Sequence, residues 1–250
     1  MSALSRFTQR RPLLATGSSD NTAKLWRFSP DGSTATYVAT LAGHAASVNS
    51  VAFHPTEPLL ATGSSDSTAK LWQLSTENLS ATCVATLEGH GGSVYSVAFH
   101  PTEPLLATGS SDMTMKLWNL PKLSPPPDAN PNPLFSAKAE EPQVVNNPVS
   151  IKVSQSGVVR SVAFDPKNGS LLATVDSTYT VKLWQLTSEH QSAICVNTSE
   201  RTNSANSIAF HPTRLLLATG TNLIDAKLYT YEELPPKPDT TPNPCNGPNC

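Results

Sequence analysis

A 24-residue stretch of this chain occurs twice with almost no change, and this repeat constrains the fold more than any other feature. Residues 51–74 and 97–120 share the pattern VAFHPTEPLLATGSSD-x-T-x-KLW-x-L and differ at only three positions. More divergent copies end at Trp26, Trp184 and Tyr229, so that successive copies are 46, 46, 66 and 45 residues apart. Such a period predicts one small structural unit that is stacked along the chain.

Each unit is predicted to form four short strands. In residues 47–87, prolines and a Ser-Asp-Ser turn separate runs that are rich in Val, Leu, Thr and small residues. The predicted strands are Ser47–His54, Leu59–Ser64, Thr68–Leu74 and Ala81–Leu87. Repeated four-stranded units of this kind are typical of propeller blades.

The repeats contain several spaced motifs of one known family. These motifs are the Gly-His pairs at 43–44 and 89–90, the SVAF strand, the ATGSSD strand and turn, and KLW. On these residues, the chain resembles the WD-repeat (Trp-Asp repeat) β-propellers over residues 2–231, although no repeat has Asp directly after its Trp. The resemblance implies an all-β propeller of about five four-stranded blades. Because closed propellers of this family usually have seven blades, we expect an open or incomplete ring.

The resemblance also implies a hydrogen-bonded tetrad of His, Thr, Asp and Trp within a blade. Such a network stiffens a blade because its buried polar groups are satisfied. Two repeats have all four residues, and we expect them to be the best-ordered blades. They are His44, Thr62, Asp66 and Trp72 in the second repeat, and His90, Thr108, Asp112 and Trp118 in the third. A catalytic Ser/His/Asp triad is the alternative, but a hydrolase needs one activated nucleophile, whereas this set recurs in successive repeats.

One position of the innermost strand differs between repeats that are otherwise nearly the same. This position holds Asn49, Tyr95, Arg160 and Asn206 in repeats two to five. In each repeat, it lies two residues before the second apolar residue of the strand. Tyr and Arg are enriched among the residues that dominate binding energy at interfaces. We therefore predict that these four residues bind a partner. The alternative is drift at a tolerant exposed site.

Proline marks the parts of the chain outside the repeats, since eight of the 22 prolines lie between 121 and 148. We predict blades one to three in residues 1–120, a Pro-rich flexible insert in 121–148, blades four and five in 149–233, and a Pro-rich disordered tail in 234–250. We expect the chain to return at about Val144–Val153 as the fourth strand of blade three, whereas blade five lacks a fourth strand. The third strand of blade five would then be an open edge, through which the chain could self-associate.

Charge and composition exclude several classes of function. The net charge is −2 and only 14% of the residues are charged, so the chain lacks the basic surface of a nucleic-acid-binding protein. No apolar run is long enough to span a membrane, and the first residues have no apolar signal-peptide core. We therefore expect no membrane association and an intracellular location in the cytoplasm, with the nucleus as the alternative. No CxxC pair is present, and we expect neither a metal nor a cofactor.

Together, these features predict a non-catalytic scaffold that binds protein or peptide partners through the propeller rim and the inserted loop. The prediction depends on the resemblance, because a fold alone does not determine function. Two alternatives stay open: a truncated product of a longer WD-repeat gene, and a small-ligand or enzymatic propeller. The second alternative would need Asp, Glu or His on the inner strands, and the predicted partner-binding position holds none of these.

Overall fold

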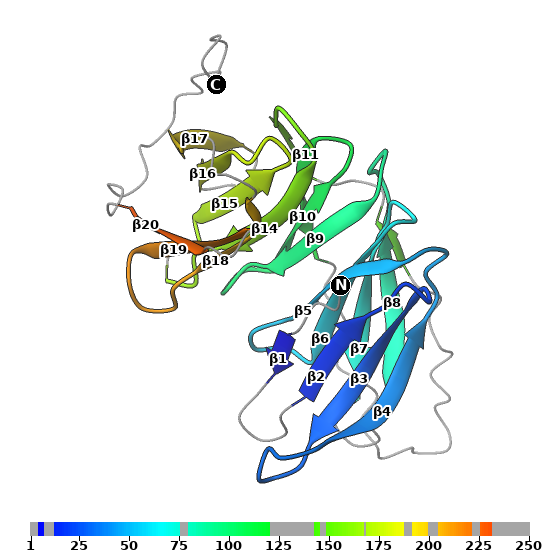
Figure 1. Ribbon diagram of the computed structural model, residues 1–250. Coiled ribbons are helices and arrows are strands. Elements are labelled where there is room, and N and C mark those ends of the chain that lie inside the picture. The colour runs from blue at the N-terminus through cyan, green and yellow to red at the C-terminus, as the bar shows by residue number, and fades with distance from the viewer. Residues whose placement is uncertain are drawn as a thin grey trace.

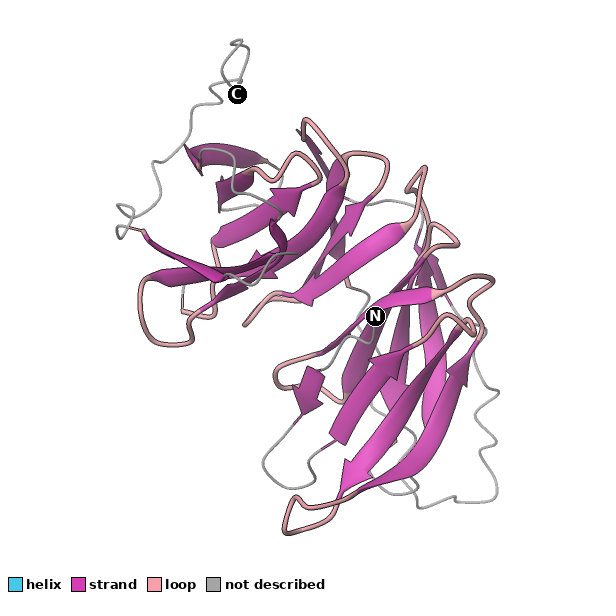
Figure 2. Cartoon of the chain, in the orientation of Figure 1, coloured by secondary structure: helices cyan, strands magenta, loops and turns pink. Residues whose placement is uncertain are grey.

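The computed structural model describes residues 5–7, 13–75, 80–120, 143–145, 149–167, 169–187, 192–199, 205–221 and 226–231. These residues form twenty strands, and none of them lies in a helix (Figure 1, Figure 2). The strands are grouped into five sheets that follow one another along the chain. The all-β fold that the repeats predict is therefore confirmed, and each sheet is one blade.

Each blade is built from strands that follow one another along the chain. Blade one contains β1 (Ser5–Phe7), β2 (Leu13–Gly17), β3 (Thr22–Phe28) and β4 (Ala35–Ala42). Blade two contains β5 (Val48–Phe53), β6 (Leu59–Ser64), β7 (Ala69–Leu74) and β8 (Ala81–Leu87). Blade three contains β9 (Val94–Phe99), β10 (Leu105–Ser110), β11 (Thr114–Asn119) and β13 (Val149–Ser154). Blade four contains β14 (Val159–Phe164), β15 (Leu171–Asp176), β16 (Val181–Leu186) and β17 (Ala193–Thr198), and blade five contains β18 (Ala205–Phe210), β19 (Leu216–Thr221) and β20 (Ala226–Thr230).

The segment after blade three is divided between two blades. Strand β13 pairs antiparallel with β11 and is the fourth strand of blade three. Strand β12 (Gln143–Val145) instead pairs in parallel with β8, the outer strand of blade two. Only the second part of the expected Val144–Val153 return therefore belongs to blade three. The free edge of β8 explains the difference, because it offers backbone groups that an extended segment can pair with. Residues 121–142 and 232–250, which contain most of the predicted insert and the predicted tail, lie outside the described residues.

The hydrophobic core consists of four clusters, each of which lies between two consecutive blades. In each cluster, a surface of one blade that contains Ala and Leu packs against a surface of the next blade that contains larger residues such as Phe, Trp or Tyr. We call these two surfaces the forward face of a blade and the backward face of the blade that follows it. On β5, β6 and β7, the forward face of blade two includes Ser50, Ala52, Ala61, Gly63, Ala69 and Leu71, and β8 adds Ala85 and Leu87. The backward face of blade three comprises Val94, Val97, Phe99, Leu106, Trp118 and Leu120.

The blades approach closely at a glycine of the second strand. A Cβ atom on Gly63 would lie 2.8 Å from Val94 Cγ1, and one on Gly109 would lie 2.6 Å from Val159 Cγ1. Blade four instead has Val175 at this position, and its counterpart on blade five is Ala205 rather than Val. The larger side chain of the pair thus lies on the earlier blade at this interface and on the later blade at the others. The total side-chain volume at the contact is therefore similar.

Hydroxyl groups on the inner strands also connect the blades. The backbone N–H of Val97 donates to Ser50 Oγ, and that of Val162 donates to Ser96 Oγ, both at 3.1 Å. The backbone N–H of Ile208 donates to Ser161 Oγ at 3.3 Å. The same contact therefore recurs at three successive interfaces.

The five blades form an arc that does not close (Figure 1). Blade one lies at one end of the arc and blade five lies at the other end. Among the described residues, blade five has three strands, and β20 pairs on one side only, with β19. The structure therefore agrees with the predicted open or incomplete ring.

Candidate functional site

The residues predicted as the tetrad of blade two form a continuous chain of hydrogen bonds. The indole Nε1–H of Trp72 donates to Thr62 Oγ1 at 2.9 Å, and Thr62 Oγ1 lies 2.7 Å from His44 Nε2. On the other side of the ring, His44 Nδ1 lies 2.7 Å from Asp66 Oδ2. The four residues come from β6, β7, the turn between these strands, and the loop before β5.

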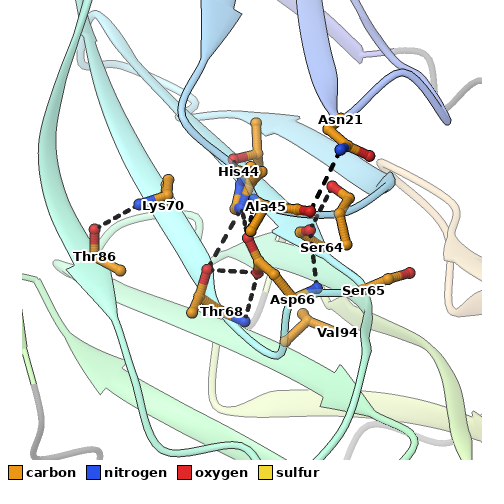
Figure 3. A network of polar contacts seen from close by, with 12 residues as sticks. Asn21, His44, Ala45, Ser64, Ser65, Asp66, Thr68, Lys70, Thr86 and Val94 are labelled. Carbon is orange, nitrogen blue, oxygen red and sulfur yellow. Dashed lines mark hydrogen bonds and ion pairs between the residues drawn. The ribbon is translucent and has the colours of Figure 1, made fainter.

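Asp66 also organises the turn in which it lies. Figure 3 shows its carboxylate beside His44, Ala45 and Thr68. The backbone N–H groups of Ala45 and Thr68 donate to it at 3.0 and 2.9 Å, and the Thr68 hydroxyl donates at 2.7 Å. One carboxylate therefore ties the loop before β5 to the turn between β6 and β7.

The tetrad is compatible with a neutral His44. In that state Thr62 accepts the indole proton of Trp72 and donates its own proton to His44 Nε2, and His44 Nδ1–H donates to Asp66. Burial lowers the pKa of His44, and the neighbouring Asp66 opposes this only in part. Burial raises the pKa of Asp66, but hydrogen bonds from Thr68, Ala45 and His44 outweigh it and lower this pKa to about 2. Neutral imidazole beside ionised carboxylate is thus the stable arrangement.

Blade three repeats this geometry almost atom for atom. His90 lies 2.7 Å from Asp112 Oδ2 and 2.6 Å from Thr108 Oγ1, and Trp118 donates to Thr108 at 2.9 Å. Burial likewise lowers the pKa of His90. The pKa of Asp112 is lowered to about 2, because hydrogen bonds from Thr114 and His90 outweigh its burial.

The other blades retain only parts of the network. In blade one, Trp26 donates to Thr16 at 3.0 Å, whereas Asp20 is exposed and accepts hydrogen bonds from Thr22. In blade four, Gln155 takes the place of the His and donates its side-chain N–H to Thr174.

The turn of blade four is held by a different carboxylate. Asp176, two positions earlier than Asp66 and Asp112 in the repeat, accepts hydrogen bonds from the backbone N–H groups of Thr178 and Thr180. In blade five, Thr219 is fully buried, and the tetrad positions between β19 and β20 lie outside the described residues.

The tetrads have no geometry for attack on a substrate. The hydroxyl groups of Thr62 and Thr108 belong to fully buried residues, and each is already engaged by a Trp and a His. A nucleophile must reach the substrate and have an oxyanion site beside it. The network is therefore internal to the blade.

The four predicted partner-binding residues fall into two groups. Asn49 Nδ2 donates to Val94 O on the next blade at 3.0 Å, and Asn206 Oδ1 accepts from Arg160 Nη1 at 2.7 Å. Both Asn residues are only partly exposed and contact a neighbouring blade. Tyr95, which is 40% exposed, and Arg160, which is also exposed, occupy equivalent positions on β9 and β14. The structure thus brings two large, accessible side chains to the same end of adjacent inner strands.

The turns between the second and third strands carry further large side chains at this end of the blades. The residue after the Asp position has a left-handed backbone in four blades, with φ between 63° and 70°. Asn tolerates this conformation, as at Asn21, whereas Ser67, Met113 and Tyr179 adopt it at a cost. Met113 is also half exposed. Tyr179 is a further large residue at this end of the blades that was not predicted from the sequence. Its position directly after Asp-Ser-Thr in the fourth repeat was the available signal.

A cavity of about 260 Å³ lies between blades four and five. Val181, Leu183 and Leu217 line its apolar side, and Asn197, Ser199 and the last residues of β20 line the remainder. Next to it, Tyr231 donates its hydroxyl proton to Asp165 Oδ2 at 2.9 Å. This bond ties the end of blade five to blade four, and together with burial it raises the pKa of Tyr231.

Three segments of the chain match the family model of the WD domain, G-beta repeat. They are residues 2–27, 35–73 and 81–119, which cover the first three repeats. These matches show that the first three repeats are WD repeats, and the five sheets of the structure are consistent with a WD-repeat β-propeller. A comparison with curated proteins gave no match.

Neither a membrane-spanning helix nor a metal centre is found in the described part of the chain. Among the described residues, no helix has the length and apolar character needed to cross a membrane. Over the same residues, no group of three or more His, Cys, Asp or Glu side chains lies close enough together to hold a metal ion.

Proposed function

We propose that this protein is a non-catalytic scaffold that binds protein or peptide partners on the rim of the arc where Tyr95 and Arg160 are exposed. WD repeats typically mediate protein interactions, which supports the general role. The observation that supports this site is the contrast within the repeat. Blades two and three are nearly identical, yet Asn49 is turned to an interblade contact where blade three has the exposed Tyr95.

The chemistry of this surface favours a peptide or protein over a small ligand. Tyr95 offers an aromatic ring with a hydroxyl group, Arg160 offers a guanidinium group, and Met113 offers a flexible apolar side chain in a turn of blade three. Tyr and Arg are frequent among the residues that dominate interface energy, and Met adapts to differently shaped partners. The equivalent position in blades two and five holds Asn, so the inner strands supply no carboxylate there for ligand chemistry.

The double substitution Tyr95→Asn/Arg160→Asn tests the proposal. The fold already accepts Asn at this position in blades two and five, so the variant should stay folded. Affinity capture followed by mass spectrometry should show that the variant loses the partners of the unchanged protein. Tyr37→Asn/Val196→Asn is the matched control, because it removes two exposed apolar side chains from the outer strands β4 and β17.

Undiminished capture by a folded Tyr95→Asn/Arg160→Asn variant would contradict this site. The inserted loop is then the remaining proposed contact. Replacing residues 122–142 with a short Gly-Ser bridge should in that case remove capture while the thermal transition stays nearly unchanged.

We also propose that the chain self-associates through blade five. The open side of β20 presents backbone groups that another strand can pair with. Lys227 on this strand is a mild deterrent, whereas Leu228 and Tyr229 favour association.

A further inference from the structure

On its three described strands, the forward face of blade five has six residues in common with the forward face of blade two. In blade two they are Ser50, Ala52, Ala61, Gly63, Ala69 and Leu71, and in blade five they are Ser207, Ala209, Ala218, Gly220, Ala226 and Leu228. The pairing is also the same, since Ala61 is paired with Leu71 and Ala218 with Leu228. The backward face of blade five differs in sequence from that of an interior blade and packs against blade four. Its forward face has the residues of an interior blade.

The two faces differ in what covers them. Leu71 is 0% exposed beneath blade three, whereas Leu228 is 70% exposed. Ala69 is buried while its counterpart Ala226 is exposed. A Cβ atom on Gly220 would meet only the side chain of Ser207, whereas on Gly63 it would meet Val94 and Val97 of the next blade. A surface with the composition of an interior interface is therefore left open at the end of the arc.

The interior of the chain shows what kind of surface binds such a face. On blade two, the occupant is the backward face of blade three, which contributes Val, Phe, Leu and Trp side chains. Val94 and Val97 approach Gly63, and the backbone N–H of Val97 donates to Ser50 Oγ. The complement of the forward face of blade five is thus the backward face of another WD-type blade.

One such backward face is also open on this chain. In blade two, Leu60, Trp72 and Leu74 lie on the backward face and are buried under blade one. Their counterparts in blade one are Leu14, Trp26 and Phe28, and all three are partly exposed. The corresponding faces of blades two, three and four are already covered within the chain.

We propose that the forward face of blade five binds the backward face of blade one of a second copy, so that the chains assemble head to tail. This inference deepens the proposed self-association and assigns it to the apolar face around Leu228 instead of the backbone edge of β20. The contact joins two different surfaces, so it generates a closed ring or an open filament and not a simple two-fold dimer.

Sedimentation of the full chain over a range of concentrations tests the proposal. The unchanged protein should form species larger than the monomer, and Leu228→Asp should weaken association by at least about tenfold because it places a charge in an apolar contact. Val196→Asp is the matched control, since it alters an exposed apolar residue on the outer strand of blade four.

A monomer at all concentrations would overturn the proposal, as would equal assembly of the unchanged protein and a folded Leu228→Asp variant. The second result would leave the β20 edge as the contact. Partner capture by Leu228→Asp should match that of the unchanged protein. Failure of self-association can therefore be distinguished from failure of the partner-binding site at Tyr95 and Arg160.

Discussion

Replacing Asp66 by Ala should destabilise the protein by about 3 kcal/mol. The substitution leaves His44 Nδ1–H without its acceptor in a side chain that is 0% exposed, and an orphaned buried donor costs about 1–3 kcal/mol. It also removes two bonds from Thr68 to the carboxylate, each of which contributes about 0.5–1.5 kcal/mol. For a chain of this size, about 3 kcal/mol corresponds to a fall of roughly 6–12 °C in melting temperature.

The chain contains its own controls for this experiment. Asp112→Ala should have the same effect as Asp66→Ala, because the tetrad of blade three has the same contacts. Asp20→Ala should change the melting temperature little, because this exposed carboxylate contacts Thr22 and Lys24 at the surface, where water replaces it. Calorimetry of the three variants measures the difference. Equal shifts for all three would refute the argument that the buried His makes the Asp important.

Three further predictions concern pH, packing and backbone strain. The fold lowers the pKa of His44 and of His90, so the contribution of these residues to stability is complete above the ordinary pKa of 6.5 and decreases as the pH falls below it. The variant His44→Gln/His90→Gln, which copies Gln155, should therefore show a weaker dependence of the melting temperature on pH over this range. Gly109→Val should destabilise the protein by about 1–3 kcal/mol. Adding Val159→Ala should restore part of this loss, as the natural pair of Val175 and Ala205 indicates. A double-mutant cycle in urea that shows no coupling between the two substitutions would contradict this. Met113→Asn should stabilise by about 1 kcal/mol in thermal denaturation, because Asn tolerates the left-handed backbone that Asn21 adopts in blade one.

Local patterns in the repeat were sufficient to predict the strands of an interior blade. The predicted Leu59–Ser64 and Ala81–Leu87 are β6 and β8 without any change of bounds. The agreement has a physical cause, because Pro58 and the turn at Asp66 bound β6, whose six residues are all buried, and Gly89, with a φ of 142°, follows β8. The contacts of His44 with Thr62 and Asp66 are those that the resemblance to the WD-repeat family implies.

Pairings between distant segments could not be predicted in this way. Nothing in the local sequence of Gln143–Val145 specifies parallel pairing with β8 instead of a place in blade three. The exchange of Gly and Val for Val175 and Ala205 is visible only once blades four and five are known to be in contact. The sequence also placed Asn49 and Tyr95 in one class, whereas the structure shows that the first faces a neighbouring blade.

Hydrogen exchange measures most directly whether the chain is an open arc of WD-type blades whose last blade has an uncovered forward face. The informative comparison is that of β20 with β7 and β16 in the Leu228→Asp variant. We predict fast exchange of β20 beside slow exchange of β7 and β16, because only β20 lies in an uncovered edge position among these three strands. Equal protection of all three strands in the monomeric variant would show that blade five is covered within its own chain, and would contradict the open arc.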